Sequence, residues 1–327
     1  MRLTVLVNEL AGVKADQTTW LLVCAMLDRG HEVAVGGVAD LELSPDDRVR
    51  LRAARLTAPA PSPAEALATL LASPPTSVDL FEEAGVLVRT NPGRDPRTWV
   101  HHTALDLLRL VRDAGVGVLN DPDGLARARS KLYLSCLPRE VHPRTLVTAD
   151  KRALRAFIEA APGPVVLKPL VGSRGQDVFK VQRGSENLGQ IVDVLCRDAF
   201  AMAQDFVPEA VDGDTRVILV EGDILMVDGQ AAAVRRVPGQ GEFRSNVFQG
   251  GHAEAGGLTP TMARITAAIG PRLRADGLFL VGMDLIGDRI VELNVFSPGG
   301  MGDANGFAGV DFIAPVVAAM ERRLAPT

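Results

Sequence analysis

The chain has 327 residues, of which 47% are hydrophobic, and 35 basic against 40 acidic side chains give a net charge of −5. This length exceeds one average domain, and the composition is that of a globular protein, which excludes disordered and collagen-like classes. The slightly negative charge argues against a nucleic-acid partner, because phosphate backbones are bound by basic surfaces.

The ends and the cysteines of the chain give no sign of export. No stretch approaches the ~20 apolar residues that a membrane helix needs. The first residues, MRLTVLVNEL, fit a β-strand better than a signal peptide. Cys24, Cys136 and Cys196 stand far apart, so neither a zinc site nor a disulfide framework is indicated. We therefore expect a cytoplasmic protein with no membrane partner.

The first 120 residues alternate predicted strands and helices. The strands are expected at 2–7, 32–38, 84–92 and 116–121, and the helices at 16–31 and 98–115. Such alternation predicts parallel β-α-β units and hence a Rossmann-like parallel-sheet lobe at 1–120. Residues 57–79, with five prolines that flank a short helix, are expected to form a surface excursion. His101 and His102 are expected on the surface of their helix.

Two further lobes are predicted beyond this point. Residues 121–200 should form a small central α+β lobe, with strands at 164–170 and 177–182 and helices at 122–137, 151–161 and 188–198. Residues 201–327 should form a mostly antiparallel sheet lobe. Its strands are expected within 200–237 and 282–295, and its helices at 260–277 and 310–324.

The segment GMDLIGDRIVELNV, residues 282–295, reads as a hairpin that carries polar side chains. A two-residue turn would place Asp284 opposite Val291, whereas a three-residue turn, Gly287 to Arg289, would place Asp284 opposite Glu292. Only the second register gathers Asp284, Glu292 and Asn294 on one face. Three oxygen donors without His or Cys suit Mg²⁺ that also binds phosphate. Taken alone, the pattern favours ordinary solvent-facing strand residues.

The segment VVLKPLVGSRGQDVFKV, residues 165–181, joins two apolar strands through a glycine-bearing turn. Lys168 ends the first strand, and Gly172 and Gly175 would let backbone amides approach phosphate oxygens. The chain contains no P-loop pattern. A turn with glycines is common in any hairpin, so this segment gains meaning only from the order of the neighbouring motifs.

That order resembles the ATP-grasp superfamily and, within it, the prokaryotic glutathione synthetases. The similarity covers nearly the whole chain and is carried by VLNDPDGLARARSKLYLSCL, VVLKPLVGSRGQDVFKV, AQDFVP, DGDTRVILVEGD, RRVPGQGEFRSNVFQGG and IGPRLRADGLFLVGMDLIGDRIVELNV. The resemblance implies an ATP-grasp fold behind the Rossmann-like lobe. It also implies an ATP-dependent ligase that activates a carboxylate as an acyl phosphate, which an amine then converts to an amide.

Positions that match the family's motifs acquire expected roles. Those implied to bind ATP are Lys131, Lys168, Gly172, Ser173, Gly175, Gln204, Phe206, Val207 and Asp214. Those implied to act on the transferred phosphate and the acyl group are Arg216, Arg236 and Asn246. The metal ligands would be Asp284, Glu292 and Asn294, and the substrate-binding residues Arg89, Arg244 and Ser297. The loop that carries Arg244 and Asn246 is expected to close over the acyl phosphate and exclude water.

The implied cofactors are ATP and two Mg²⁺ ions, with Mn²⁺ as an alternative. The implied partners are small carboxylate and amine substrates, γ-glutamylcysteine and glycine first, and further copies of the chain in a dimer or tetramer. The segment NVFSPGGMGDANG, from Asn294 onward, departs from the family's Thr-Ser-Pro-Thr-type segment, which keeps other amino-acid or peptide substrates open. A catalytically inactive ATP-binding regulator and a kinase are further alternatives.

Overall fold

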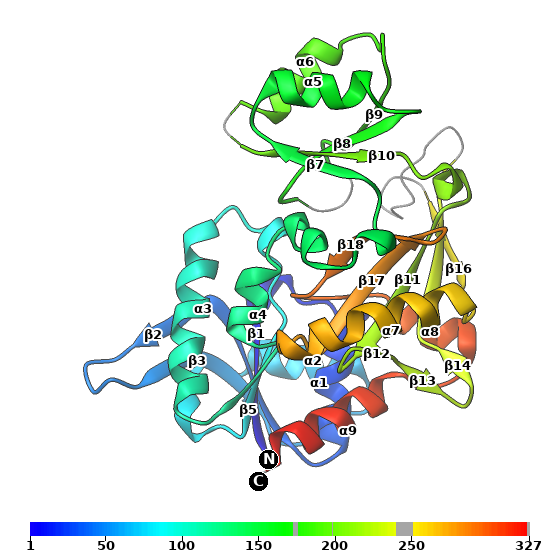
Figure 1. The fold of residues 1–327 in the computed structure, drawn as a ribbon. Helices are drawn as coiled ribbons and strands as arrows, with labels where there is room; N and C mark the ends of the chain where they lie inside the picture. The colour runs from blue at the N-terminus through cyan, green and yellow to red at the C-terminus, as the bar shows by residue number, and fades with distance from the viewer. Residues whose placement is uncertain (173–175, 198, 240–250, 326–327) are drawn as a thin grey trace.

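The computed structural model describes residues 1–172, 176–197, 199–239 and 251–325. Within these ranges, two six-stranded sheets and one four-stranded sheet form the framework, with a two-stranded pair beside them. The four-stranded sheet and its helices make a small lobe above a larger body that contains both six-stranded sheets (Figure 1). The chain is therefore built as the mixed α/β and α+β arrangement that the sequence predicts.

The first sheet has the strand order β4-β3-β2-β1-β5-β6. Its central strand β1 (Arg2–Val7) pairs in parallel with both neighbours, which confirms the predicted parallel opening. Leu3 to Val7 are all buried, as expected of a parallel strand covered on both faces. The other elements here are β2 (Glu32–Leu43), β5 (Gly85–Val88), β6 (Gly117–Leu119), α1 (Thr18–Asp28), α3 (Thr98–Asp113) and α4 (Pro122–Arg127).

Three expectations for this region are wrong. Strand β3 (Val49–Leu56), an antiparallel partner of β2, was not predicted, although its apolar residues alternate with Arg50 and Arg52. Residues 57–79 contain the expected short helix, α2 (Pro63–Ala72), but they are more than a surface excursion, because they end in β4 (Thr76–Asp79), which pairs with β3. His101 is buried rather than exposed, because Asp95 accepts a 3.0 Å hydrogen bond from its ring.

The small lobe is an antiparallel sheet of order β7-β10-β8-β9. The helices α5 (Lys151–Glu159) and α6 (Leu188–Leu195) lie on one side of it, above the sheet in Figure 1. Its strands are β7 (Thr145–Thr148), β8 (Val165–Pro169), β9 (Phe179–Val181) and β10 (Ala201–Asp205). The helix predicted at 122–137 is broken, since α4 ends at Arg127 and Lys131–Cys136 form a 3₁₀ segment.

The third sheet has the order β16-β15-β11-β17-β18, with β12 paired to β11. Its strands are β11 (Asp214–Val220), β12 (Asp223–Ile224), β15 (Ala233–Val237), β16 (His252–Ala255), β17 (Leu280–Ile286) and β18 (Arg289–Asn294), and the separate pair is β13 (Met226–Val227) with β14 (Gln230–Ala231). The chain continues through α7 (Pro260–Ala275), α8 (Met301–Ala308) and α9 (Ile313–Leu324). Every pairing in this sheet is antiparallel, as predicted.

The last helix, α9, returns to the first lobe and packs against α1, so the two chain ends lie close together (Figure 1). Glu321 of α9 pairs with Arg29 and His31, at 2.5 and 2.7 Å. The division into 1–120, 121–200 and 201–327 stays a prediction. In the parts of the chain that the structure describes, no helix combines the length and apolarity needed to cross a membrane.

Candidate active site

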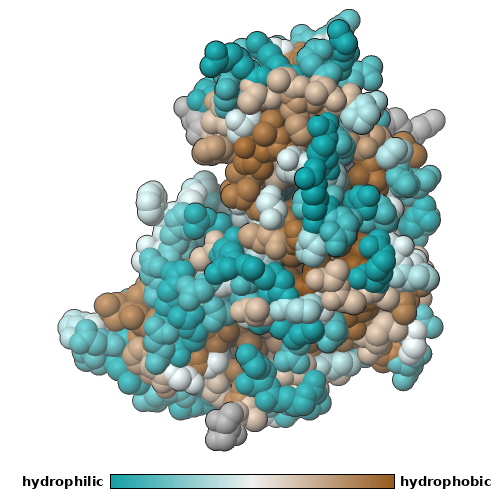
Figure 2. All heavy atoms as spheres, viewed as in Figure 1, coloured by the Kyte–Doolittle hydropathy of each residue, from teal (hydrophilic) through white to brown (hydrophobic). Residues whose placement is uncertain are grey.

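A cavity of about 1190 Å³ is lined by residues of all three sheets. Figure 2 shows that the outline of the molecule narrows between the small lobe and the body, where hydrophobic side chains gather on the visible face. The predicted site residues that line the cavity are Arg89, Lys131, Lys168, Gly172, Gln204, Phe206, Val207, Asp214, Arg216, Arg236, Asp284, Glu292, Asn294 and Ser297. Ser173, Gly175, Arg244 and Asn246 lie outside the described residues.

The hairpin β17–β18 has the predicted register at its polar end but reaches it differently. Asp284 lies opposite Glu292, and Gly282 opposite Asn294, so the three oxygen-bearing side chains share one face. The predicted three-residue turn is wrong, because Ile286 pairs with Arg289 across a two-residue turn. A β-bulge supplies the missing residue: the register shifts after Asp284, which leaves Val291 as the extra residue of β18.

Asp284 is held by two arginines from neighbouring strands. Arg216 donates to both of its carboxylate oxygens, at 2.7 and 2.6 Å, and Arg236 approaches Oδ2 to 2.8 Å. Burial alone would raise the pKa of Asp284, which is 2% exposed, but the two guanidinium groups lower the pKa to about 2. The carboxylate is therefore charged at all physiological pH values.

Arg236 also donates to Asp214, at 2.6 Å. Burial by itself would lower the pKa of Arg236, but Asp284 and Asp214 raise it above the ordinary value for arginine. The predicted role of Arg216 and Arg236 toward a substrate is not tested by this geometry. Both planar guanidinium groups are held by carboxylates, and both arginines line the cavity.

Two lysines meet above the hairpin. Lys131 Nζ lies 3.3 Å from Glu292 Oε1 and donates to the carbonyl of Gly172 at 3.1 Å. Lys168 is 7% exposed, and its Nζ donates to the carbonyl of Val291 at 3.3 Å. Burial, together with the charge of Lys131, lowers the pKa of Lys168 to about 8. A bound polyanion would stabilise the charged form of such a buried lysine and raise its pKa.

The donor set fits a hard divalent cation. Asn294 Nδ2 lies 3.3 Å from Asp284 Oδ2, and Glu292 is the direct cross-strand partner of Asp284, so the three side chains converge. Among the described residues, no group of three His, Cys, Asp or Glu side chains could bind a metal ion. A site here would thus use two carboxylates and one amide, with phosphate or water oxygens as the remaining ligands, which is how proteins bind Mg²⁺.

The small lobe supplies an apolar and aromatic wall. Phe206 follows β10 in the chain, and the Nζ of Lys180 lies 3.7 Å from its ring centroid. Gln204 is 2% exposed and donates to the hydroxyl of Thr145 at 3.0 Å. Val166, Val178, Phe206 and Val207 line the cavity here, and apolar side chains beside a strand end suit the base of a nucleotide.

Arg89 is a buried cation at the opposite wall. It is 4% exposed, its Nε donates to Thr19 Oγ1 at 3.0 Å, and one Nη donates to the carbonyl of Pro298 at 2.7 Å. Its other Nη has no hydrogen-bond partner among the described residues, and no acidic side chain there pairs with it. Burial lowers the pKa of Arg89 to about 9. The arginine therefore offers an unused donor and an uncompensated charge.

Sequence reasoning missed the other residues of this wall. Asn8 follows β1 and Asn91 lies just beyond β5, and each bonds to the other: Asn8 donates to the Asn91 carbonyl at 3.0 Å and accepts from its amide at 2.6 Å. Both line the cavity. A signal was present, because ligands of parallel sheets bind at the carboxyl ends of the strands. Thr19, the partner of Arg89, has no such signal.

Two family models match the chain in succession. Residues 1–126 match the N-terminal domain of prokaryotic glutathione synthetase, and residues 130–308 match its ATP-grasp domain. The chain is 35% identical to a glutathione synthetase of Synechococcus elongatus over 329 aligned residues, which covers 98% of both chains.

Solved structures with low sequence identity share the fold. The crystal structure of the D-cycloserine synthetase DcsG aligns with a TM-score of 0.67 at 18% identity, covering 99% of this chain and 100% of that one. The ATP-grasp ligase PsnB, in complex with a minimal precursor, Mg and ADP, aligns with a TM-score of 0.62 at 18% identity, covering 98% of each chain. By its sequence, its ATP-grasp fold and the residues gathered in its cavity, the chain belongs to the prokaryotic glutathione synthetases, a family of ATP-dependent carbon–nitrogen ligases.

Proposed function

We propose that this enzyme joins γ-glutamylcysteine to glycine at the expense of ATP, through an acyl phosphate. One observation carries the proposal: a single cavity brings together a lysine pair, a carboxylate pair and a buried arginine with an unused donor. These three groups suit, in turn, a triphosphate, its divalent cation and the carboxylate of a peptide. The match over nearly the full length of a glutathione synthetase supports this choice of substrates.

The proposed roles follow from position. Lys131 and Lys168 would offset charge on the phosphates, and Phe206 and Val207 would hold the base. Mg²⁺ at Asp284, Glu292 and Asn294 would supply further charge neutralisation and fix the phosphate orientation. Arg216 and Arg236 would face the oxygens of the transferred phosphoryl group. Such transfer depends on positioning and electrostatic stabilisation, so no protein nucleophile is needed.

The peptide substrate would lie against the Arg89 wall. Arg89 contacts the carbonyl of Pro298, and Ser297 beside it also lines the cavity. The one Nη of Arg89 that has no hydrogen-bond partner among the described residues would donate to the substrate carboxylate, which would orient the substrate for attack by the amine. Arg244 and Asn246 would act from the loop that closes over the acyl phosphate.

Replacing Arg89 with methionine is expected to raise the KM for the peptide substrate by about 10- to 100-fold, the value of a charged hydrogen bond, with little change in the KM for ATP. The free energy of unfolding should stay the same or rise, because the buried cation that is removed has no acidic partner among the described residues. Initial rates and urea unfolding would test both parts.

Arg55→Met provides the matched control. Arg55 also has an Nη without a hydrogen-bond partner among the described residues, but its side chain pairs at 4.0 Å with Glu32 and at 2.7 Å with Glu83, whose side chain is 1% exposed. Its loss should destabilise the fold and leave the KM for the peptide unchanged. An R89M enzyme with a normal KM for every substrate would remove Arg89 from the site.

Nucleotide affinity should depend on the charge of Lys168. Since its pKa is lowered to about 8, the side chain loses its proton as the pH rises through this value, and the affinity for ADP should decrease in the same range. Lys168→Met should bind ADP about 10- to 100-fold more weakly at pH 7, with a flatter pH dependence between pH 7 and 9. Calorimetric titrations of ADP at several pH values would measure this, and an identical pH profile in both proteins would contradict it.

A coupled assay of ADP release across amino acids and dipeptides tests the function itself. We expect release only when a carboxylate and an amine are both present, with γ-glutamylcysteine plus glycine as the best pair. A different best pair would indicate a ligase of another pathway, and no release would indicate a regulatory protein. Hydroxylamine distinguishes ligation from a kinase reaction, because it traps an acyl phosphate as a hydroxamate.

We also propose that the enzyme uses two Mg²⁺ ions, which Mn²⁺ can replace, and that it assembles as a dimer or tetramer. The converging oxygen donors of the hairpin and the kinship with glutathione synthetases support these points. Activity titrations with each metal and light scattering after size-exclusion chromatography would test them.

A further inference from the structure

Asn120, the residue that directly follows β6, bonds to two strand segments of the third sheet at once. Its amide nitrogen donates to the carbonyls of Leu280, at 3.0 Å, and Val295, at 2.5 Å. Its amide oxygen accepts from the backbone nitrogen of Leu280 at 2.8 Å. The residue is 3% exposed, so all three bonds are shielded from water. All three of these hydrogen bonds join the Asn120 side chain to the two arms of the hairpin.

These bonds lie at the open end of the hairpin that carries the proposed metal ligands. The last backbone pair of β17 and β18 there is Gly282 with Asn294. One residue beyond Asn294 and two residues before Gly282, the side chain of Asn120 takes over as the bridge between the strands. The chain then leaves the sheet and reaches Pro298, whose carbonyl accepts from Arg89. Asn120 thus lies between the proposed metal ligands on the hairpin and the segment that leads to Arg89.

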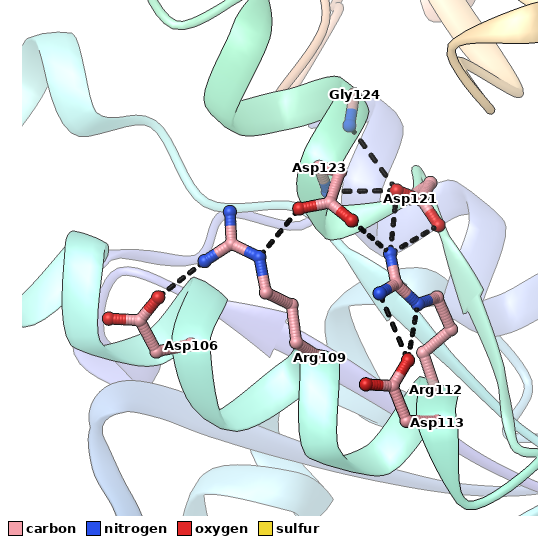
Figure 3. Close-up of polar contacts among 7 residues, drawn as sticks. All are labelled: Asp106, Arg109, Arg112, Asp113, Asp121, Asp123 and Gly124. Carbon is pink, nitrogen blue, oxygen red and sulfur yellow. Dashed lines mark hydrogen bonds and ion pairs between the residues drawn. The ribbon is translucent and has the colours of Figure 1, made fainter.

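Asn120 is itself held in place from the first lobe. Its neighbour Asp121 is the N-cap of α4: the Asp121 carboxylate accepts hydrogen bonds from the backbone amides of Asp123 and Gly124. Arg112 of α3 contacts the carboxylates of both Asp121 and Asp123, and Arg109 contacts Asp123 as well (Figure 3). The strand end is therefore anchored to a four-turn helix, not to a loose loop.

The backbones of the two lobes touch at this point. The amide of Asp121 donates to the carbonyl of Gly277 at 3.0 Å. A Cβ placed on Gly124 would come within 1.9 Å of the carbonyl oxygen of Asp276, so only glycine allows this approach. Side-chain contacts can adjust, but contacts between backbones fix the distance between α4 and the start of β17.

We propose that Asn120 is a positioning residue for catalysis: it sets the hairpin with Asp284, Glu292 and Asn294 in register with the Arg89 wall of the first lobe. The proposal rests on the proposed ligase function, since it concerns the same cavity. An asparagine is required because the position needs a donor for two carbonyls and an acceptor for one amide. Aspartate, with the same shape, would set a carboxylate against the two carbonyls and donate nothing.

The test is the variant Asn120→Asp, with Asn120→Ser as a second variant that keeps a smaller polar group and can be used if the first does not fold. The control is Thr4→Val, which removes a buried 3.0 Å hydrogen bond to Glu83 in the first lobe without touching the hairpin. For each protein, calorimetry measures ADP binding in EDTA and in excess Mg²⁺, and initial rates give kcat and KM.

We expect N120D to lower kcat and the Mg²⁺-dependent gain in ADP affinity by about 10- to 100-fold, as for residues that orient metal ligands. Binding of ADP in EDTA should change much less, because Lys168 of β8 and the proposed base contacts Phe206 and Val207, which follow β10, belong to the small lobe. T4V should lose stability only. If N120D and N120S keep the wild-type Mg²⁺ effect and kcat, or lose ADP binding equally with and without Mg²⁺, the positioning role is wrong. If the wild type itself shows no Mg²⁺ effect and no ligation, it is the proposed function that fails.

Discussion

Replacing Asp284 with asparagine is expected to abolish ligation and also to destabilise the fold. Asp284 is 2% exposed and accepts hydrogen bonds from Arg216, at 2.7 and 2.6 Å, while Arg236 approaches it to 2.8 Å. Without its charge, two guanidinium groups remain buried beside a neutral amide. Breaking a buried ion pair from one side costs about 3–5 kcal/mol, which urea unfolding measures directly.

Asp46→Asn is the matched control for stability, because Asp46 forms its bidentate contacts with Arg50 at the protein surface, where water replaces them. The expected change in unfolding free energy is small. If D284N were as stable as the wild type and as active, the two-arginine clamp and the metal assignment would both be contradicted.

The pH dependence of stability follows from the same carboxylate. Its pKa in the folded protein is about 2, below the ordinary value of 3.8, so the folded state favours the charged form. The stabilisation is complete above the unfolded pKa and is lost as the pH falls through about 2. D284N should lack this part of the acid dependence, which acid titrations of the unfolding free energy would show by comparison with the wild type.

Replacing Glu292 with glutamine should also abolish activity but, unlike D284N, should keep the fold stable. The Glu292 side chain is 34% exposed, and its described ion pair is the 3.3 Å contact with Lys131. Such a partly exposed pair contributes little to stability. As a proposed metal ligand, however, the carboxylate should matter at least as much as the groups that merely orient ligands, so we expect kcat to fall by at least about 100-fold.

Glu254→Gln is the control for this change, since Glu254 is an exposed strand residue paired with His252 at 3.0 Å. It should leave both the melting temperature and kcat unchanged. Activity of E292Q within a few-fold of the wild type would show that Glu292 is not a ligand. A large loss of stability in E292Q would instead point to a structural role.

The hairpin illustrates what sequence patterns determine. Alternation of side chains across a strand, with the demand for three oxygens on one face, predicted the Asp284–Glu292 pairing, and that pairing is confirmed. The turn length was wrong because a bulge and a longer turn add the same one residue to the register. Strand periodicity does not distinguish them, and the bulge residue, Val291, is contacted by the distant Lys168, which donates to its carbonyl.

The parts that could not be predicted are contacts between distant segments. The clamp on Asp284 needs Arg216 and Arg236 on adjacent strands of a sheet whose order is not readable from the chain. The three bonds of Asn120 depend likewise on packing between lobes, as does the lack of a hydrogen-bond partner for one Nη of Arg89 in the part of the chain that the structure describes. Local patterns also failed, at β3, where arginines in alternate positions obscured a half-buried strand, and at 122–137, where a continuous helix was expected but α4 ends at Arg127.

The central claim is that the cavity transfers the γ-phosphoryl group of ATP to a carboxylate before the amide forms. The most direct measurement is a reaction of γ-glutamylcysteine, labelled with ¹⁸O in the glycine-accepting carboxylate, with glycine and ATP, followed by mass analysis of the released phosphate. We expect one labelled oxygen in the phosphate for each amide formed. Phosphate without label, formed together with the amide, would contradict the account.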